Sequence, residues 1–287
     1  MTRTSATPSS LRRRAAHRKA QRRRARRILF GCLLAILGTV WLVKLPGRGP
    51  SSTPAPKVVK SSLVPAATPA GDEETRRQAI LNDTGGTWPQ SLRELLERHP
   101  DALAFVEGYP DHKDDAPADS IGTVETGPFP LLLQWDARWG YARYGDDLLA
   151  VTGCGPTCLS MAAAGLTGDD TVTPAAVAAR AQRDGYWVDG VTSWELMRTG
   201  CEAWGLVSEE LPLSESEVTD ALENGRPVIC SVRPGDFTTT GHFILLAGME
   251  DGSIRVNDPN SPQNSDRLWT YDELEPQIRN LWAFSAS

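Results

Sequence analysis

Acidic residues are missing from the first 71 residues of this 287-residue chain, because every Asp and Glu lies at Asp72 or later. Residues 1–27 instead carry eleven Arg and Lys side chains. From Asp72 onward, 15 basic residues stand against 36 acidic ones, a net formal charge of −21. An acidic body of this kind repels polyanions, so we expect no nucleic-acid binding by the main domain.

Cysteine is also scarce. The five cysteines are too few and too scattered for a disulfide scaffold, and they are Cys32, Cys154, Cys158, Cys201 and Cys230. One disulfide among the last three is compatible with an oxidising compartment. No Cys-x-x-Cys pair or His/Cys cluster has the spacing of a zinc site, and no Walker motif or internal repeat occurs. The sequence therefore implies no metal and no organic cofactor.

One apolar run, residues 28–43, contains no charged side chain and is followed by Lys44 and Leu45. This is short for a membrane-spanning helix, which needs roughly 17–25 residues, but a snorkelling lysine extends the usable length. The basic tip before it, residues 1–27, predicts a cytoplasmic N-terminus. We expect an uncleaved transmembrane signal-anchor at 28–45, with the C-terminal body outside the cell membrane. A cleaved signal peptide and a secreted protein are the alternative, although no convincing cleavage site follows.

Two segments separate the apolar run from the main domain. Residues 46–71 are rich in Pro, Ser, Thr and Ala, which predicts a disordered linker. Residues 72–118 predict a small helical N-terminal subdomain, in which Ser91 and Glu94 have the spacing of a capping box. The apolar face of that helix is expected to contain Leu92, Leu95 and Leu96.

The main domain is expected over residues 119–287. Helical signals come first, near residues 156–166, 174–183, 192–205 and 214–225. Strand signals follow, near residues 227–232, 241–249, 253–257 and 282–285. Helices followed by an antiparallel sheet predict an α+β fold.

The segment Gly153-Cys154-Gly155-Pro156-Thr157-Cys158 reads as a loop that turns into a helix. The two glycines permit tight backbone geometry, and Pro156 suits the first turn of a helix. Cys154 therefore lies at a helix N-terminus, where unpaired N–H groups and the helix dipole favour a thiolate. This placement predicts Cys154 as a sulfur nucleophile. Cys158, one turn further on, is a possible rival whose expected role is buried packing.

A thiolate nucleophile needs an imidazole within hydrogen-bonding reach. The chain has four histidines, His17, His99, His112 and His242. His17 belongs to the cytoplasmic tip, and His99 and His112 lie among polar residues, where surface positions are expected. His242 is the only histidine in the domain of Cys154, at the start of a predicted strand, and is therefore the expected acid/base.

The histidine in turn needs an acceptor that orients it. If Glu250-Asp251-Gly252 forms a three-residue loop, Met249 pairs with Ser253, and Ile244 pairs with Asp258. His242 and Asp258 then become diagonal neighbours on one face, roughly 7–8 Å apart at the backbone. We therefore favour Asp258 as the orienting residue. A simple turn role for Asp258, before Pro259, and an orienting role for Asp236 are the alternatives.

The oxyanion that forms on an attacked carbonyl needs hydrogen-bond donors. The backbone N–H of Cys154 is one candidate. A side-chain amide upstream would be another, and Gln134 precedes Cys154 by 20 residues. By spacing alone this assignment is weak, because any loop can contain a glutamine.

Four segments in this order resemble the papain-like cysteine peptidases of family C39. They are Gln134-Trp135-Asp136 with Trp139-Gly140, Gly153-Cys154-Gly155-Pro156-Thr157, Gly241-His242-Phe243 and Asn257-Asp258-Pro259. The resemblance implies a papain-like fold and a cysteine-type peptidase acting on a peptide or protein substrate. It also implies that Cys154 is the nucleophile, His242 the acid/base, Asp258 the orienting residue and Gln134 the oxyanion-hole amide.

Leader peptidases of that family are fused to an exporter that has a nucleotide-binding domain. This chain shows no Walker motif and no multi-span region, so it resembles the stand-alone branch. A non-catalytic peptide-binding module on the same scaffold and a thiol transpeptidase or amidase acting on cell-wall peptides are the alternatives. The sequence indicates no oligomeric state. The main domain contains four tryptophans near these segments, Trp135, Trp139, Trp187 and Trp194. We expect them to pack in the core, and the alternative is that they line a peptide cleft.

Overall fold

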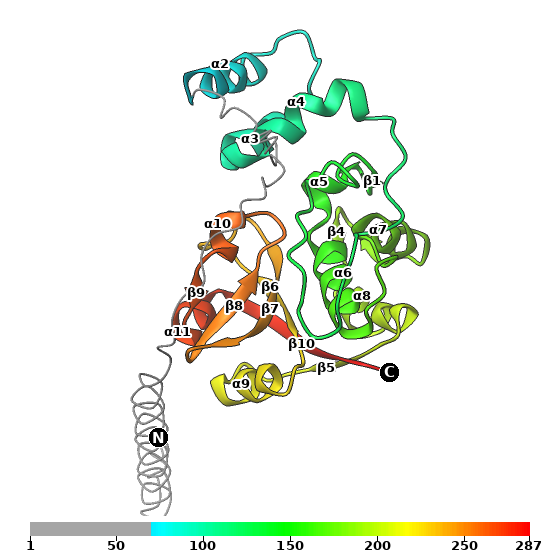
Figure 1. Ribbon diagram of the computed structural model, residues 1–287, viewed down its shortest axis with the longest axis vertical. Helices are drawn as coiled ribbons and strands as arrows, with labels where there is room; N and C mark the ends of the chain where they lie inside the picture. The colour runs from blue at the N-terminus through cyan, green and yellow to red at the C-terminus, as the bar shows by residue number, and fades with distance from the viewer. Residues whose placement is uncertain (1–69) are drawn as a thin grey trace, which may run out of the picture. The chain divides into compact units, whose positions relative to one another are not determined.

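The computed structural model describes residues 70–287 (Figure 1). The predicted basic tip (1–27), the signal-anchor (28–45) and residues 46–69 of the linker lie outside the described residues. Between residues 70 and 287, no helix has the length and apolarity that a membrane crossing requires. The described part has the predicted α+β architecture, with helices first and an antiparallel sheet after them.

The N-terminal helical segment consists of α2 (Ala70–Leu81), α3 (Gln90–Arg98), the 3-10 turn η1 (Pro100–Ala102) and α4 (Leu103–His112). The predicted apolar face is confirmed, because Leu92, Leu95 and Leu96 are all buried. The predicted capping box is wrong: α3 begins at Gln90 directly after Pro89, and no side chain caps it. Ser91 therefore lies inside the first turn, where its hydroxyl is not at the capping position.

This segment shares a hydrophobic cluster with the main domain. Ile80, Leu96 and Phe105 pack in one cluster with Trp135 and Ala150. The hydroxyl of Tyr141 also donates to the carbonyl oxygen of Phe105, at 2.7 Å. The N-terminal helices therefore pack on the segment of the main domain that precedes Cys154.

The helical layer contains one long helix and several short pieces. Its elements are β1 (Arg143–Tyr144), β2 (Asp147–Leu148), α5 (Leu149–Thr152), α6 (Cys154–Thr167), α7 (Pro174–Arg183), β3 (Trp187–Val188), β4 (Val191–Thr192), α8 (Glu195–Arg198) and η2 (Gly200–Trp204). The prediction for α7 is confirmed, with the Thr173 hydroxyl accepting from the N–H of Ala176 at 3.1 Å. The prediction of one helix over 192–205 is wrong, because Thr192 ends a hairpin and the backbone leaves the helical region at Thr199.

The sheet layer has six strands, in the order β5-β10-β6-β7-β8-β9, and every neighbouring pair is antiparallel. The strands are β5 (Leu206–Glu210), β6 (Val228–Val232), β7 (His242–Glu250), β8 (Ser253–Asn257), β9 (Leu268–Trp269) and β10 (Ile278–Ala286). The last predicted strand, near 282–285, is part of β10, which lies inside the sheet. The remaining elements are α9 (Glu215–Glu223), α10 (Pro262–Ser265), α11 (Tyr271–Leu274) and η3 (Glu275–Gln277).

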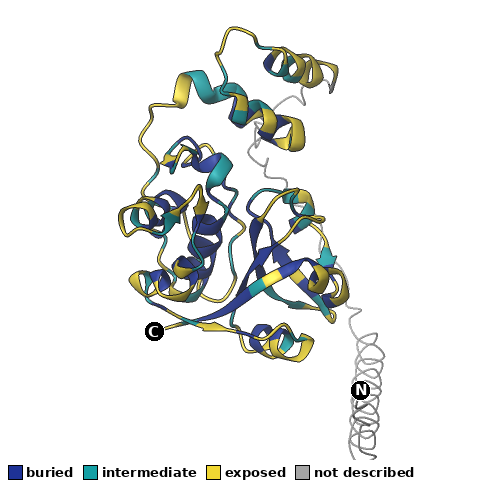
Figure 2. Ribbon diagram, turned by 180° about the vertical axis from the view of Figure 1, so that it is seen from behind, coloured by how far each residue is buried: buried dark blue, intermediate teal, exposed yellow. Residues whose placement is uncertain are grey.

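The middle of the sheet packs against helices on both faces, whereas most of the edge strand β5 is exposed, and Figure 2 shows the buried residues in dark blue. Ile229 and Leu245 pack in one cluster with α6 and α7, whereas Cys230 and Ile244 pack in a second cluster with α9 and α11. Neighbouring residues of one strand therefore face different helices, as the alternation of side chains along a strand requires. All five residues of β6 are buried, and four of the five are apolar, as expected for a strand that is covered on both faces.

The β7–β8 hairpin corrects the predicted loop. Asp251 (φ 50°) and Gly252 (φ 81°) form a two-residue turn, so Met249 pairs with Ile254 and not with Ser253. A bulge between Leu246 and Gly248 then shifts the register by one residue, and Leu245 pairs with Asn257. Beyond the bulge, the register is therefore the one that the sequence predicts for the His242 end of the hairpin.

Candidate active site

Cys154 is the first residue of α6, as the sequence predicts. The two glycines beside it are required for space. A Cβ at Gly153 would lie 2.4 Å from the carbonyl oxygen of Leu149, and a Cβ at Gly155 would lie 2.9 Å from Thr192. The chain can thus reverse from α5 into α6 only with glycine at these positions. As a result, Cys154 is half-buried, and its N–H is among the first donors of the helix, which have no acceptor within it.

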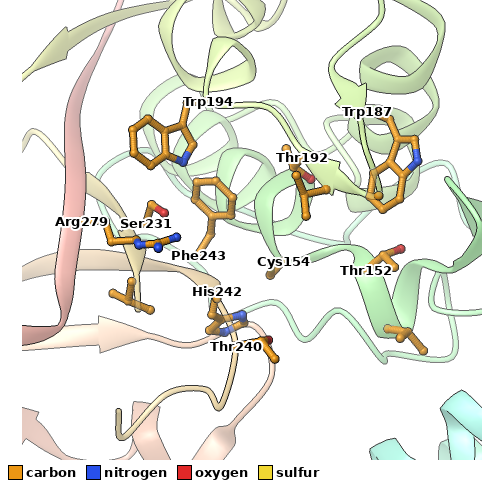
Figure 3. A pocket seen from close by; sticks show the side chains of 15 residues that line it. Thr152, Cys154, Trp187, Thr192, Trp194, Ser231, Thr240, His242, Phe243 and Arg279 are labelled. Atoms are coloured by element: carbon orange, nitrogen blue, oxygen red, sulfur yellow. The ribbon is translucent and has the colours of Figure 1, made fainter. Parts of the chain in front are cut away.

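The structure brings Cys154 and His242 together from opposite layers. His242 begins β7 and is 7 % exposed. Its Nε2 atom lies 2.8 Å from Oδ1 of Asp258, and its imidazole is close enough to Cys154 for the charges of the two groups to interact. Since Nε2 is committed to the carboxylate, Nδ1 is the ring nitrogen available to the sulfur. Figure 3 shows the two side chains next to each other in the cleft.

Asp258 is fully buried and accepts several hydrogen bonds. Its Oδ1 atom accepts from the N–H of Asn260 at 2.9 Å, and Oδ2 accepts from Nδ2 of Asn264 at 2.8 Å. Burial alone raises the pKa of this carboxyl, but the His242 charge and these donors outweigh it and lower the pKa. Asp236, the competing residue, is exposed and accepts from Gln277 at 2.8 Å instead. Asp258 is therefore the acid at the histidine.

Opposite charges stabilise each other in this site. Burial raises the pKa of the Cys154 thiol, but the imidazolium of His242 and the N–H groups of Gly155 and Phe243 outweigh it, so the pKa is lowered from 9.0. Burial lowers the pKa of His242, but the Asp258 carboxylate and the Cys154 thiolate together raise it to about 10. The charged forms of the two groups, a thiolate and an imidazolium, thus stabilise each other.

Gln134 is buried and contacts two segments of the chain that flank the site. Its backbone N–H donates to the carbonyl oxygen of Pro259 at 2.7 Å, and its Nε2 atom donates to the carbonyl oxygen of Ala150 at 2.8 Å. The side-chain amide has two hydrogens, so one N–H is left for another acceptor. Gln134 thus connects the segment that precedes Cys154 to the segment that follows Asp258, but it is not among the residues that line the cleft.

The other described cysteines differ from Cys154 in their surroundings. Cys158, Cys201 and Cys230 are fully buried, and all four described cysteines are free thiols. Burial raises the pKa of Cys158 well above its ordinary value and that of Cys201 to about 11. The predicted packing role of Cys158 is confirmed, and Cys201 and Cys230 also belong to the core clusters.

A cleft of about 460 Å³ runs over Cys154 and His242. Figure 3 shows Trp187 and Thr152 at one end, and Trp194, Ser231 and Arg279 at the other. The expected core packing of the tryptophans is correct for Trp135 and Trp139, which are buried. Trp187 and Trp194 are half-buried and do both: they pack against the core cluster and also form part of the cleft wall.

One residue near the site has no signal in the local sequence. Nε2 of His99, at the end of α3, accepts a hydrogen bond from Nδ2 of Asn260 at 3.0 Å. The predicted surface position is therefore wrong for His99, which is half-buried, and its pKa is lowered because burial disfavours the charged ring. The prediction is right for His112, which is exposed and lies 2.8 Å from Asp115. The contact of His99 joins residues far apart in the chain, so only the folded structure reveals it.

The fold is that of a papain-like cysteine peptidase, in which a cysteine at a helix N-terminus and a histidine from an antiparallel sheet line one cleft. The model of the Peptidase C39-like family matches residues 127–285, more than half of the chain, and the chain belongs to this family. It therefore carries a C39-like cysteine peptidase domain.

Comparisons with solved structures give two further likenesses. The peptidase domain of Streptococcus ComA, a bifunctional ABC transporter involved in a quorum-sensing pathway, is 15 % identical with a TM-score of 0.40, covering 55 % of this chain and 99 % of that one. A protein from Bacillus anthracis described as a C39-like peptidase is 14 % identical with a TM-score of 0.36, covering 57 % of this chain and 98 % of that one. No significant match is found among the curated proteins.

Proposed function

We propose that this chain hydrolyses peptide bonds, with Cys154 as the nucleophile and His242 as the acid/base. The observation that supports this most strongly is the arrangement of Cys154 and His242 in one cleft, with the imidazole hydrogen-bonded to the buried Asp258. A binding module would need no thiol whose pKa is lowered, and burial alone would raise it. Membership in a peptidase family supports the same conclusion.

The geometry suggests how each step proceeds. The Cys154 thiolate attacks the carbonyl carbon of the scissile peptide, and the C=O electron pair moves to oxygen. The N–H of Cys154 and the second N–H of Gln134 stabilise that oxyanion. As the C–N bond breaks, the imidazolium of His242 gives its proton to the departing amine, which leaves a thioester on Cys154.

Water completes the reaction in the second half of the cycle. The imidazole of His242, now neutral, takes a proton from water as the oxygen attacks the thioester carbonyl. The C–S bond breaks, a carboxylic acid leaves, and the thiolate–imidazolium pair is restored. Asp258 acts throughout as a positioning residue, because it fixes the ring and stabilises its charge without touching the substrate.

Hydrolysis can be separated from its alternatives by isotope labelling. The full chain is incubated with a synthetic peptide mixture in H₂¹⁸O, with glycine amide added as an acceptor amine. Hydrolysis predicts fragments with one ¹⁸O atom at each new C-terminus, whereas a transpeptidase would produce fragments ending in glycine amide. A binding module would give no products beyond those of the Cys154→Ala variant, and this outcome would overturn the proposal.

We further propose that the enzyme acts outside the cell, on peptides or proteins reached from a membrane anchor at residues 28–45. The support is the uncharged run 28–43 directly after the basic residues 1–27. N-terminal sequencing of the mature protein separates a retained anchor from a cleaved signal. Digestion of intact cells with an added protease tests the location, since a cytoplasmic domain would be protected.

A further inference from the structure

Arg279 lines the catalytic cleft although no group of the protein requires it there. The residue lies on β10 at a register shift between Ile278 and Asn280, and Figure 3 shows its side chain at the Trp194 end of the cleft. Within residues 70–287, its guanidinium makes neither an ion pair nor a side-chain hydrogen bond, whereas nine other arginines form ion pairs. Its five N–H donors are thus available to a ligand.

The charge of the cleft is the opposite of that of the domain around it. From Asp72 onward the chain has a net formal charge of −21, yet no Asp, Glu or Lys lines the cleft. Arg279 is the one permanent cation among the described residues that line it. A carboxylate placed there meets a guanidinium with no competing acid in the lining, and the planar fork suits a carboxylate in a bidentate arrangement.

We propose that Arg279 selects peptides that present a carboxylate to the Trp194 end of the cleft. The inference deepens the proposed function and rests on it, because it assigns a substrate class to the same site. The carboxylate can come from an Asp or Glu side chain, or from a free C-terminus close to the scissile bond. The flat face of Trp194 at the same end offers the aliphatic part of such a residue an apolar surface.

Protection of Cys154 from alkylation tests this binding preference without requiring turnover. The full chain is treated with iodoacetamide, and labelling of Cys154 is followed by peptide mapping. Three pools of acetylated tetrapeptides compete with the reagent. The first contains Asp and Glu with amidated ends, the second contains Asn and Gln with amidated ends, and the third is the second pool with free C-termini.

The charge of Arg279 decides the expected result. For the wild type, the first or the third pool should protect at concentrations about tenfold lower than the second, because a charge-assisted bidentate contact is lost in the neutral pool. Arg279→Gln should remove that difference. Arg143→Gln should keep it, because Arg143 is exposed, likewise makes no ion pair or side-chain hydrogen bond in the described part, and does not line the cleft. The pool that protects identifies the source of the carboxylate.

Equal protection by all pools, or a difference that survives Arg279→Gln, would overturn the inference. If Arg279→Gln does not fold, two other measurements replace it. The difference between the pools should be smaller for Arg279→Lys, and smaller for the wild type in 0.5 M NaCl, where the Debye length is roughly 4 Å. A difference unaffected by both would overturn the inference as well. Measuring the cleavage of the same pools separates the two proposals. Cleavage without a charge preference would contradict only the role of Arg279. Charge-dependent protection of Cys154 without cleavage would contradict only the proposed hydrolysis.

Discussion

The helical layer and the sheet layer each supply half of the candidate site, but they position their residues in different ways. In the helical layer, six consecutive residues, 153–158, place Cys154 at the mouth of α6. In the sheet layer, His242 and Asp258 come from different segments, and a turn, a bulge and a correct register must all form before they meet. The position of Cys154 therefore depends on local geometry, whereas the proposed activation of its thiol depends on long-range pairing.

The largest effect is expected in the helical layer. Cys154→Ala should reduce peptide hydrolysis by at least about 10³-fold, because no other described thiol faces an imidazole. Cys158→Ala is the matched control one turn away. It should retain activity and lose only about 1 kcal/mol of stability, since it removes a small buried side chain. If Cys154→Ala keeps some activity, and the double variant with Cys158→Ala loses it, the nucleophile would be Cys158.

Asp258→Asn removes the negative charge of the sheet layer while keeping the side chain nearly the same shape, and it replaces one acceptor oxygen with a donor. The amide oxygen can still accept from His242, but the negative charge is lost, so Cys154 alkylation at neutral pH should fall about 10²-fold. The variant should also lose about 2 kcal/mol of stability at pH 7, the usual contribution of a charged hydrogen bond. Peptide mapping and urea denaturation measure the two effects.

The stability effect of Asp258 should depend on pH in a defined direction. Folding lowers the pKa of Asp258, so its contribution is present above the ordinary value of 3.8 and is lost as the pH falls through the folded value. Folding raises the pKa of His242 from 6.5 to about 10, so its contribution is present below 6.5 and is lost as the pH rises through 10. Parallel stability curves for wild type and Asp258→Asn on acidification would contradict this.

Gln134→Ala tests the residue that connects the layers. Removing its spare N–H should lower kcat by about 10²-fold with little change in KM, as expected for a donor that acts mainly on the oxyanion. Iodoacetamide labelling of Cys154 should stay within about twofold, because alkylation forms no oxyanion. A parallel loss of labelling would mean that Gln134 only supports the backbone at Ala150 and Pro259.

The smallest effect is expected at the far end of the hairpin. Gly252 has φ 81°, so Gly252→Ala should destabilise the protein by about 1 kcal/mol. The bulge between Leu246 and Gly248 separates this turn from His242, so the alkylation rate of Cys154 should not change. A slower rate in a folded Gly252→Ala variant would show that the turn, and not the bulge, determines the register at the histidine.

The sequence predicts the helical half of the site well because its signals are local. Glycines, a proline and an apolar run specify the α6 start, and Thr173 before Pro174 specifies the α7 start. Where several local signals compete, prediction fails: the capping pattern at Thr192 suggests a helix, but tertiary contacts place Thr192 in a hairpin against Gly155.

The sheet half is predicted in its outcome but not in its detail. The assumed three-residue loop is wrong, yet the two-residue turn and the bulge together give the same register at Leu245 and Asn257. The contact of His99 with Asn260 and the position of Arg279 in the cleft have no local signal, because each joins segments that only the tertiary fold brings together. The roles of Cys154, His242, Asp258 and Gln134 in catalysis remain predictions for these experiments.

The most direct test is the pH dependence of Cys154 alkylation by iodoacetamide in the full chain, with His242→Ala as the comparison. The account predicts that the midpoint of the wild-type rate lies below pH 9, because the imidazolium stabilises the thiolate. In His242→Ala the midpoint should move to pH 9 or above, with a rate at pH 6 at least about tenfold lower. Superimposable curves with a midpoint near the ordinary thiol value of 9.0 would contradict the proposed thiolate–imidazolium pair.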